Sequence, residues 1–196
     1  MESVKIQQLQ EAELRQAAMV LGRAFSTQPN NLAIFGEKNI EQQSRSLFWL
    51  MLKRFPGIVY GARKDDQIVG VMRMVEWPRC QMKPLQVLRH LPSLLIISRG
   101  GALRGLRLRQ VWARHDPKKP HWHIDPLGVD PELQGKGVGS QLMTFFCERV
   151  DAEHKAAYLE TDRPANVPFY QRFGYAVTGE AEINGVRNWL MWRPSH

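Results

Sequence analysis

A glycine-rich segment, Val129-Asp130-Pro131-Glu132-Leu133-Gln134-Gly135-Lys136-Gly137-Val138-Gly139-Ser140, joins a predicted strand to a predicted helix. The apolar run Trp122–Val129 before it indicates the strand, and the apolar spacing of Ser140–Val150 after it indicates the helix. Glycines let the backbone come close to a ligand, and the first N–H groups of a helix lack intrahelical partners. The helix dipole adds roughly half a positive charge at the same point. The segment therefore predicts a binding loop for a phosphate-bearing ligand.

Two well-known phosphate-binding motifs fit this loop poorly. A P-loop requires Gly-x-x-x-x-Gly-Lys-Ser/Thr, whereas Gly137 follows Lys136 here. A dinucleotide fingerprint requires Gly-x-Gly-x-x-Gly close to the strand, but Ser140 occupies the place of its third glycine. Glu160 does lie near the expected position of a ribose-binding acid, so a dinucleotide site stays open. A plain strand-to-helix connector would not need three alternate glycines.

A third pattern, Gln-x-x-Gly-x-Gly, matches Gln134–Gly139, and a second motif follows one predicted helix and one predicted strand later. This second motif reads Asn166-Val167-Pro168-Phe169-Tyr170-Gln171-Arg172-Phe173-Gly174-Tyr175. Together the two motifs resemble those of the GCN5-related N-acetyltransferase (GNAT) superfamily, over residues 122–175. The resemblance implies an α/β fold in which helices flank a mixed, mostly antiparallel sheet of about seven strands. It also implies that this sheet is splayed between strands four and five.

The resemblance further implies acetyl-CoA as co-substrate, although it leaves open a longer acyl donor. The loop would bind the CoA diphosphate, the strand before it would pair its backbone with the pantetheine arm, and Asn166 would hydrogen-bond that arm. The residues expected to bind the cofactor are Leu127, Gly128, Val129, Gln134, Gly135, Lys136, Gly137, Val138, Gly139, Ser140, Asn166, Phe169 and Tyr170.

Family members generally work by direct attack of the amine on the thioester within a ternary complex. By its motif position, Tyr170 would be the general acid that protonates the departing thiolate. The general base is not settled: His123 titrates at about 6.5 when unperturbed, and Glu76 ends the preceding predicted strand. His121, His123 and Asp125 alternate, so they are expected on one face of the strand. A backbone N–H near residues 127–129 would stabilise the oxyanion.

The positive charge of the chain is concentrated in one segment. The formal net charge is +8, and residues 77–115 contain eight Lys or Arg residues and no Asp or Glu. We therefore expect a single GNAT-like domain over residues 1–196 with a basic helical insertion at about 83–119. Few aromatic residues interleave with these cations, so nucleic acid is not the expected partner. A small-molecule or peptide amine is the expected acceptor.

The cysteines and the hydropathy of the chain indicate which other classes of protein are not expected. Cys80 and Cys147 show no metal-ligand spacing, so we expect two unlinked thiols and no metal. The N-terminal residues lack a signal-peptide core, and no apolar run approaches the length of a membrane span. A cytoplasmic monomer or homodimer is expected. The alternative to an enzyme is a non-catalytic module that holds acyl-CoA for sensing or regulation.

Three further features of the predicted secondary structure can be compared with the folded chain. Gln28–Asn31 reads as a break between helices, and Pro84–Trp112 reads as two helical pieces joined at Pro92. The dipeptide Asn184-Gly185 predicts a hairpin between the last two strands.

Overall fold

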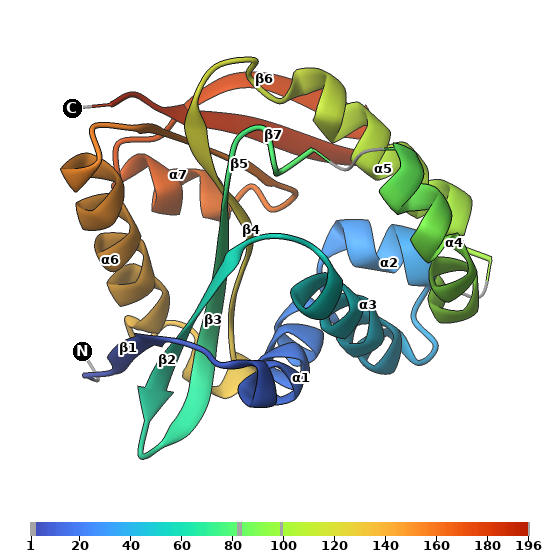
Figure 1. Ribbon diagram of the computed structural model, residues 1–196, viewed down its shortest axis with the longest axis horizontal. Helices are drawn as coiled ribbons and strands as arrows, with labels where there is room; N and C mark the ends of the chain where they lie inside the picture. Colours follow the sequence, from blue (N-terminus) through green and yellow to red (C-terminus); the bar gives the residue numbers. More distant parts are fainter. Residues whose placement is uncertain (1–2, 82–83, 99, 196) are drawn as a thin grey trace.

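The computed structural model describes residues 3–81, 84–98 and 100–195 and contains one seven-stranded sheet, in the order β1-β2-β3-β4-β5-β7-β6 (Figure 1). All neighbouring strands pair antiparallel except β4 and β5, which are parallel. The α/β fold with a mixed, mostly antiparallel sheet is therefore as predicted. The strands are β1 (Lys5–Gln8), β2 (Ile58–Lys64), β3 (Gln67–Glu76), β4 (His121–Val129), β5 (Ala156–Thr161), β6 (Ala176–Ile183) and β7 (Val186–Arg193).

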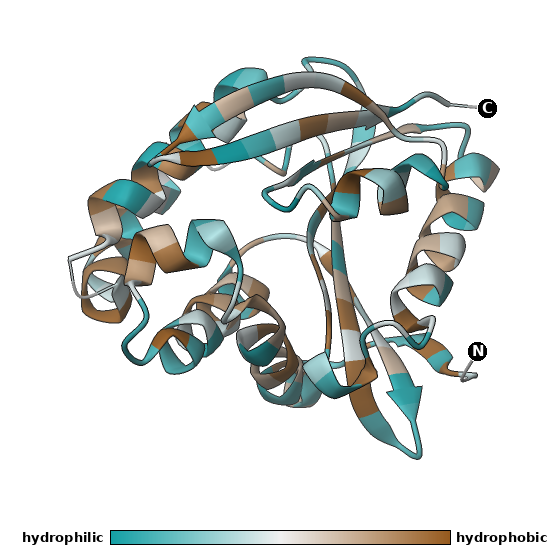
Figure 2. Cartoon of the chain, turned by 180° about the vertical axis from the view of Figure 1, so that it is seen from behind, coloured by the Kyte–Doolittle hydropathy of each residue, from teal (hydrophilic) through white to brown (hydrophobic). Residues whose placement is uncertain are grey.

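Helices cover both faces of this sheet. They are α1 (Leu14–Phe25), α2 (Pro29–Phe35), α3 (Ile40–Arg54), α4 (Pro84–Ser98), α5 (Ala102–His115), α6 (Val138–Ala152) and α7 (Asn166–Gln171), with short 3-10 helices η1 (Glu11–Glu13) and η2 (Pro131–Leu133). The buried side of α6 forms one core cluster with the central strands and α7, and α1 and α3 form a second cluster. Figure 2 shows long apolar stretches along the central strands, whereas the β2–β3 turn is hydrophilic.

The pairing of β4 with β5 ends early, and this creates the predicted splay. Only residues 121–123 of β4 pair with residues 156–158 of β5. Beyond His123, β4 stays paired with β3, with Leu127 opposite Met72 and Val129 opposite Gly70. In the described residues, the final part of β4 therefore has one backbone edge without a strand partner.

Two predicted breaks were wrong in position. The chain forms α2 from Pro29 onward, because a proline at the first helical position loses no hydrogen bond. Helix α4 continues through Pro92, which is exposed, so the carbonyl that it leaves unpaired can be hydrated. The break between α4 and α5 comes instead near Gly101, where an added Cβ would lie 1.9 Å from the Ile34 carbonyl oxygen.

The segment predicted as a basic helical insertion contains helices α4 and α5. Helix α4 packs on α3, and α5 packs on α2 and β6, so both lie at one end of the molecule (Figure 1). The predicted hairpin joins β6 to β7, with positive φ angles at Asn184 and Gly185. Two of the basic residues counted in the sequence, Lys83 and Arg99, lie outside the described residues. Across the ranges that the structure describes, no helix is long and apolar enough to cross a membrane.

Candidate functional site

A cavity of about 340 Å³ opens beside the unpaired edge of β4. Four parts of the chain meet here: the end of α1, the end of β4, the glycine-rich loop with the start of α6, and α7 with the turn before it. Eleven of the predicted cofactor residues line it: Leu127, Gly128, Val129, Gln134, Gly135, Gly137, Gly139, Ser140, Asn166, Phe169 and Tyr170. The splay and the two motifs thus come together at one place.

The loop conformation depends on glycines at two positions. Gly135 and Gly137 have φ angles of 76° and 90°, in the left-handed region that side chains disfavour. Gln134 folds the loop back by donating from Nε2 to the Val129 carbonyl over 3.0 Å. Helix α6 begins after Gly137 without a side-chain cap, so its first N–H groups remain available to an anion. An ion pair of 2.5 Å between Arg23 and Asp130 holds the loop against α1.

Two predicted loop residues do not line the cavity. The Val138 side chain is fully buried in the core under α6, and Lys136 is exposed. Two arginines that the sequence reasoning missed do line it, Arg163 and Arg172. Arg163 is held by Thr27 through hydrogen bonds of 2.7 and 2.6 Å, and Arg172 lies over the Phe169 ring. Their positions within and just before the second motif were the available signal, and their charges favour a phosphate-bearing ligand in this cavity.

Tyr170 lies in the wall of this cavity. It is 7% exposed, and its ring lies against Phe169 and 6.0 Å from Tyr175. Burial raises the pKa of the Tyr170 phenol well above its usual range, and the charge of Asp162 adds to this shift. The phenol therefore stays protonated at neutral pH, which is the state that a proton donor requires.

Neither candidate base lines the cavity. His123 is buried, and its Nε2 lies 2.8 Å from the Glu160 carboxylate. Glu76 accepts a hydrogen bond of 2.7 Å from the Lys155 ammonium at the far end of β3. His123 is thus paired with Glu160, and Glu76 is paired with Lys155. The role of either residue as general base stays a prediction.

The thiols are free, as expected, and burial raises the pKa of Cys147 to about 11. Cys147 lies in the core cluster under α6. It therefore stays protonated at neutral pH and is a poor nucleophile.

A second, mostly apolar cavity of about 150 Å³ adjoins the first, since Phe25 lines both. It is enclosed by α1, α2, α3, α4, α5 and the Asp125-Pro126 step of β4. Aromatic side chains contribute much of its wall, at Phe35, Phe48, Phe55 and Trp112. Its charged lining residues are Arg109 and Asp125. Asp125 also lies 3.8 Å from the Arg73 guanidinium.

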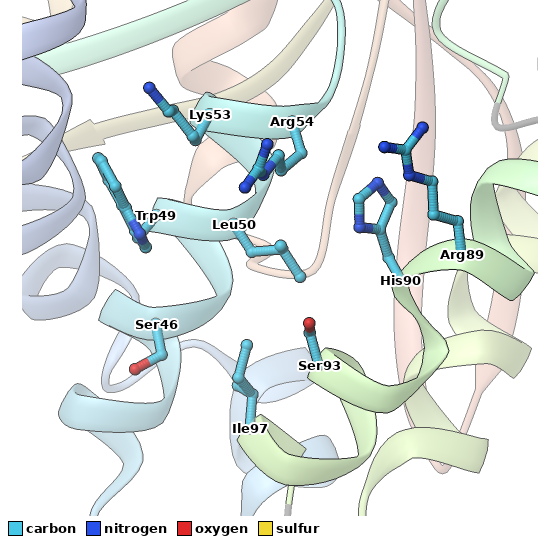
Figure 3. Close-up of a pocket in the computed structure, with 9 residues that line it drawn as sticks. All are labelled: Ser46, Trp49, Leu50, Lys53, Arg54, Arg89, His90, Ser93 and Ile97. Atoms are coloured by element: carbon cyan, nitrogen blue, oxygen red, sulfur yellow. The ribbon is translucent and has the colours of Figure 1, made fainter.

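A third cavity, about 670 Å³, is an open groove between α3 and α4 (Figure 3). Its walls carry the cationic groups Lys53 and Arg54 on α3 and Arg89 on α4, with His90 beside them. It shares no lining residue with the cavity at the splay. Arg89 of the predicted insertion therefore lies on a surface separate from the cavity at the splay.

Comparison with known proteins agrees with this geometry. The model of the acetyltransferase (GNAT) family matches residues 28–175. The histone acetyltransferase HPA2 and related acetyltransferase from Corynebacterium glutamicum is 24% identical, with a TM-score of 0.77 over 100% of this chain and 98% of that one. The polyamine N-acetyltransferase of Drosophila melanogaster, which forms N-acetylagmatine, is 15% identical, with a TM-score of 0.65 over 97% and 98%. The PaiA N-acetyltransferase of Thermoplasma acidophilum, solved with coenzyme A, is 14% identical, with a TM-score of 0.59 over 98% and 99%. At these identities the likenesses show a common fold.

Proposed function

Since this chain belongs to the acetyltransferase (GNAT) family, we propose that it transfers an acetyl group from acetyl-CoA to a primary amine by direct attack in a ternary complex. The observation that carries the proposal is the cavity beside the free edge of β4, which gathers both motifs. The CoA diphosphate binds the N–H groups that begin α6, with Arg163 and Arg172 nearby as counter-charges. The pantetheine arm pairs with the unpartnered backbone edge of residues 127–129.

The chemistry then requires one bond to form and one to break. The lone pair of the amine attacks the thioester carbonyl carbon, and the carbon–sulfur bond breaks. A backbone N–H near Leu127–Val129 stabilises the oxyanion, and Tyr170 gives its proton to the departing thiolate. The phenol enters the reaction protonated, as this role requires, and its position in the cavity wall supports the role. The amine must lose its own proton, and His123 and Glu76 stay the predicted bases for that step.

The apolar cavity next to the donor site indicates the class of acceptor. Its aromatic wall suits an amine that carries an apolar or aromatic body, and it adjoins the donor cavity at Phe25. Asp125 supplies a carboxylate that attracts the ammonium form of such an acceptor. A polyamine carries several charges into the same space, where aromatic side chains and Arg109 would meet it. We therefore propose a small apolar amine in preference to a polycation.

The test is release of free CoA thiol from acetyl-CoA with a panel of amines, namely phenethylamine, tyramine, spermidine and a lysine peptide. We expect the two aromatic amines to give the highest kcat/KM. Tyr170→Phe is expected to lower kcat by about 10²–10⁴-fold with little change in acetyl-CoA affinity. Tyr60→Phe is the matched control, since Tyr60 is also a buried tyrosine but lies on β2 away from the cavity.

Equal kcat for Tyr170→Phe and the unmodified protein would remove the general-acid assignment. Tight CoA binding without thiol release for any amine would favour the non-catalytic module instead. A preference for spermidine over the aromatic amines would contradict the proposed acceptor class while leaving the acetyltransferase activity intact.

A further inference from the structure

A cluster of four side chains from distant parts of the chain lies outside the donor cavity. Cys80 belongs to the turn that follows β3, Asp116 caps the end of α5, and His121 and His123 lie in β4. One potential ligand atom from each residue falls within 4.8 Å of all the others. Asp116, His121 and His123 are 5%, 0% and 7% exposed, whereas Cys80 is half-buried, so the cluster reaches water only on the side of Cys80.

Three of these buried polar atoms have no hydrogen-bond partner within the described residues. They are Asp116 Oδ1, His121 Nε2 and His123 Nδ1. The Asp116 and His121 atoms are 3.1 Å apart, which is an ion-pair contact when the imidazole is protonated, but they do not have the geometry of a hydrogen bond. An unsatisfied buried polar atom costs about 1–3 kcal/mol. Three that face one another therefore indicate a missing partner that all of them share.

The other polar atoms of the cluster are all engaged, and this orients the free ones. His121 Nδ1 lies 2.7 Å from the Lys119 carbonyl, and His123 Nε2 lies 2.8 Å from the Glu160 carboxylate. Asp116 Oδ2 accepts hydrogen bonds from Gln81 at 3.0 Å and from the Cys80 thiol at 3.3 Å. A metal-binding histidine usually holds its second ring nitrogen in this way, on a carbonyl or a carboxylate.

We propose that Cys80, Asp116, His121 and His123 bind a zinc ion as a four-coordinate structural site. One thiolate, two imidazoles and one carboxylate form a donor set that suits Zn²⁺. Zinc–ligand bonds of about 2.0–2.3 Å place tetrahedral ligands roughly 3.3–3.7 Å apart. The widest separations in the cluster, up to 4.8 Å, would therefore contract by about 1 Å when the ion binds, whereas Asp116 Oδ1 and His121 Nε2, 3.1 Å apart, would move slightly away from each other. Binding displaces the thiol proton and any proton on the imidazoles.

The position of the cluster explains what such an ion would do. Cys80 precedes α4 and Asp116 follows α5, so the ion would fasten both ends of the basic insertion to the start of β4. Four protein ligands leave no open coordination position for a substrate. None of the four lines the cavity at the splay, so the site is structural. A zinc-bound His123 has no free ring nitrogen to accept a proton, because Glu160 occupies the other one. With zinc bound, Glu76 is therefore the predicted base that is left for the acetyl transfer.

The proposal is tested by metal binding to the full-length chain without a histidine tag. After treatment with a chelator, Zn²⁺ is titrated in competition with a chromophoric chelator, and Co²⁺ is used as a spectroscopic probe. We expect one equivalent of each ion, with a thiolate-to-cobalt charge-transfer band and the intense visible bands of tetrahedral Co²⁺. Hydrogen exchange in α4 and α5 should slow when Zn²⁺ is added.

Matched variants assign the ligands. Cys80→Ala should abolish the charge-transfer band and lower Zn²⁺ affinity by more than the ~10–100-fold typical of outer-shell changes. Cys147→Ala, the other thiol, should leave both unchanged. Glu160→Gln keeps all four ligands and should lower the affinity by about 10-fold through His123. This variant keeps the test informative if Cys80→Ala does not fold.

Two results would overturn the site. The first is a folded protein, judged by circular dichroism, that binds neither Zn²⁺ nor Co²⁺ in competition with the chelator. The second is cobalt binding whose charge-transfer band survives Cys80→Ala or disappears in Cys147→Ala.

Discussion

Replacing Gly139 by alanine is expected to change the stability of the fold and the affinity for CoA in opposite directions. Gly139 lies in the first turn of α6, and it is not among the glycines with positive φ. A Cβ added there would lie 3.6 Å from Val129 and 3.7 Å from Phe169, which are ordinary contacts. Alanine is favoured over glycine in a helix by about 0.5–1 kcal/mol. The melting temperature should therefore rise by about 1–4 °C in a chain of this size.

The same methyl group should weaken CoA binding. Gly139, Val129 and Phe169 all line the cavity, so the methyl group occupies space that the diphosphate needs to approach the start of α6. Loss of one hydrogen bond between an N–H and a charged phosphate costs about 1.5–3 kcal/mol. That cost corresponds to roughly a 10- to 150-fold rise in Kd. Stability and affinity should thus change in opposite directions.

Calorimetric titration with CoA and thermal unfolding of the free protein measure the two effects. Gly105→Ala is the matched control: its added Cβ would lie 3.9 Å from Ile34, and it does not line the donor cavity. It should raise the melting temperature similarly and leave CoA affinity unchanged. If Gly139→Ala binds CoA with unchanged Kd, the diphosphate does not lie at the start of α6 and the reasoning fails.

Three further predictions concern the loop and two partly buried carboxylates. Gly137→Asp places a carboxylate and a side chain at a φ of 90°, so CoA binding should be lost in the same titration, and retained affinity would contradict the assignment. Asp151 accepts two hydrogen bonds, of 2.6 and 2.7 Å, from the guanidinium of Arg193, whose side chain is only 7% exposed. Asp151→Ala removes this partner, and urea unfolding should show that the free energy of unfolding falls by roughly 2–3 kcal/mol. This is below the usual cost of breaking a buried pair, because Asp151 is partly exposed. Burial raises the pKa of the Asp162 carboxyl in the folded chain, so folding favours its protonated form. The stability that this carboxyl contributes is fully present below its unfolded pKa and is lost as the pH rises through its folded pKa. Asp162→Asn keeps an acceptor for the Asn30 N–H and should raise stability at pH 7 but not at pH 3, and an equal effect at both values would refute this cause.

Much of the donor site could be predicted because its determinants are local. Gln134–Ser140 encodes both the left-handed turns and the uncapped start of α6 within a few residues, and Asn166–Gln171 forms one short helix. The splay followed only from the family resemblance, since no residue of β4 itself signals where its pairing with β5 ends.

The acceptor side could not be predicted in the same way. Asp125 and Phe25 stand in β4 and α1 without any distinguishing spacing, and they meet only because five helices close around the end of β4. The sequence around the arginines of the predicted insertion also does not indicate which cavity each side chain lines. Arg109 turns into the apolar cavity, whereas Arg89 lines the open groove between α3 and α4.

Contiguous residues were enough to specify the anion-binding loop, because backbone dihedrals and helix N–H groups depend on neighbours in the chain. The Cys80 cluster is the opposite case. The sequence shows a lone cysteine, an aspartate at a helix end and two alternate histidines, with no metal-ligand spacing. The antiparallel register that places Glu76 opposite Trp122 brings the turn holding Cys80 beside β4, and the packing of α5 returns Asp116 to the same point. Strand register and helix packing are set by the burial of the whole core, so this arrangement exists only in the folded chain.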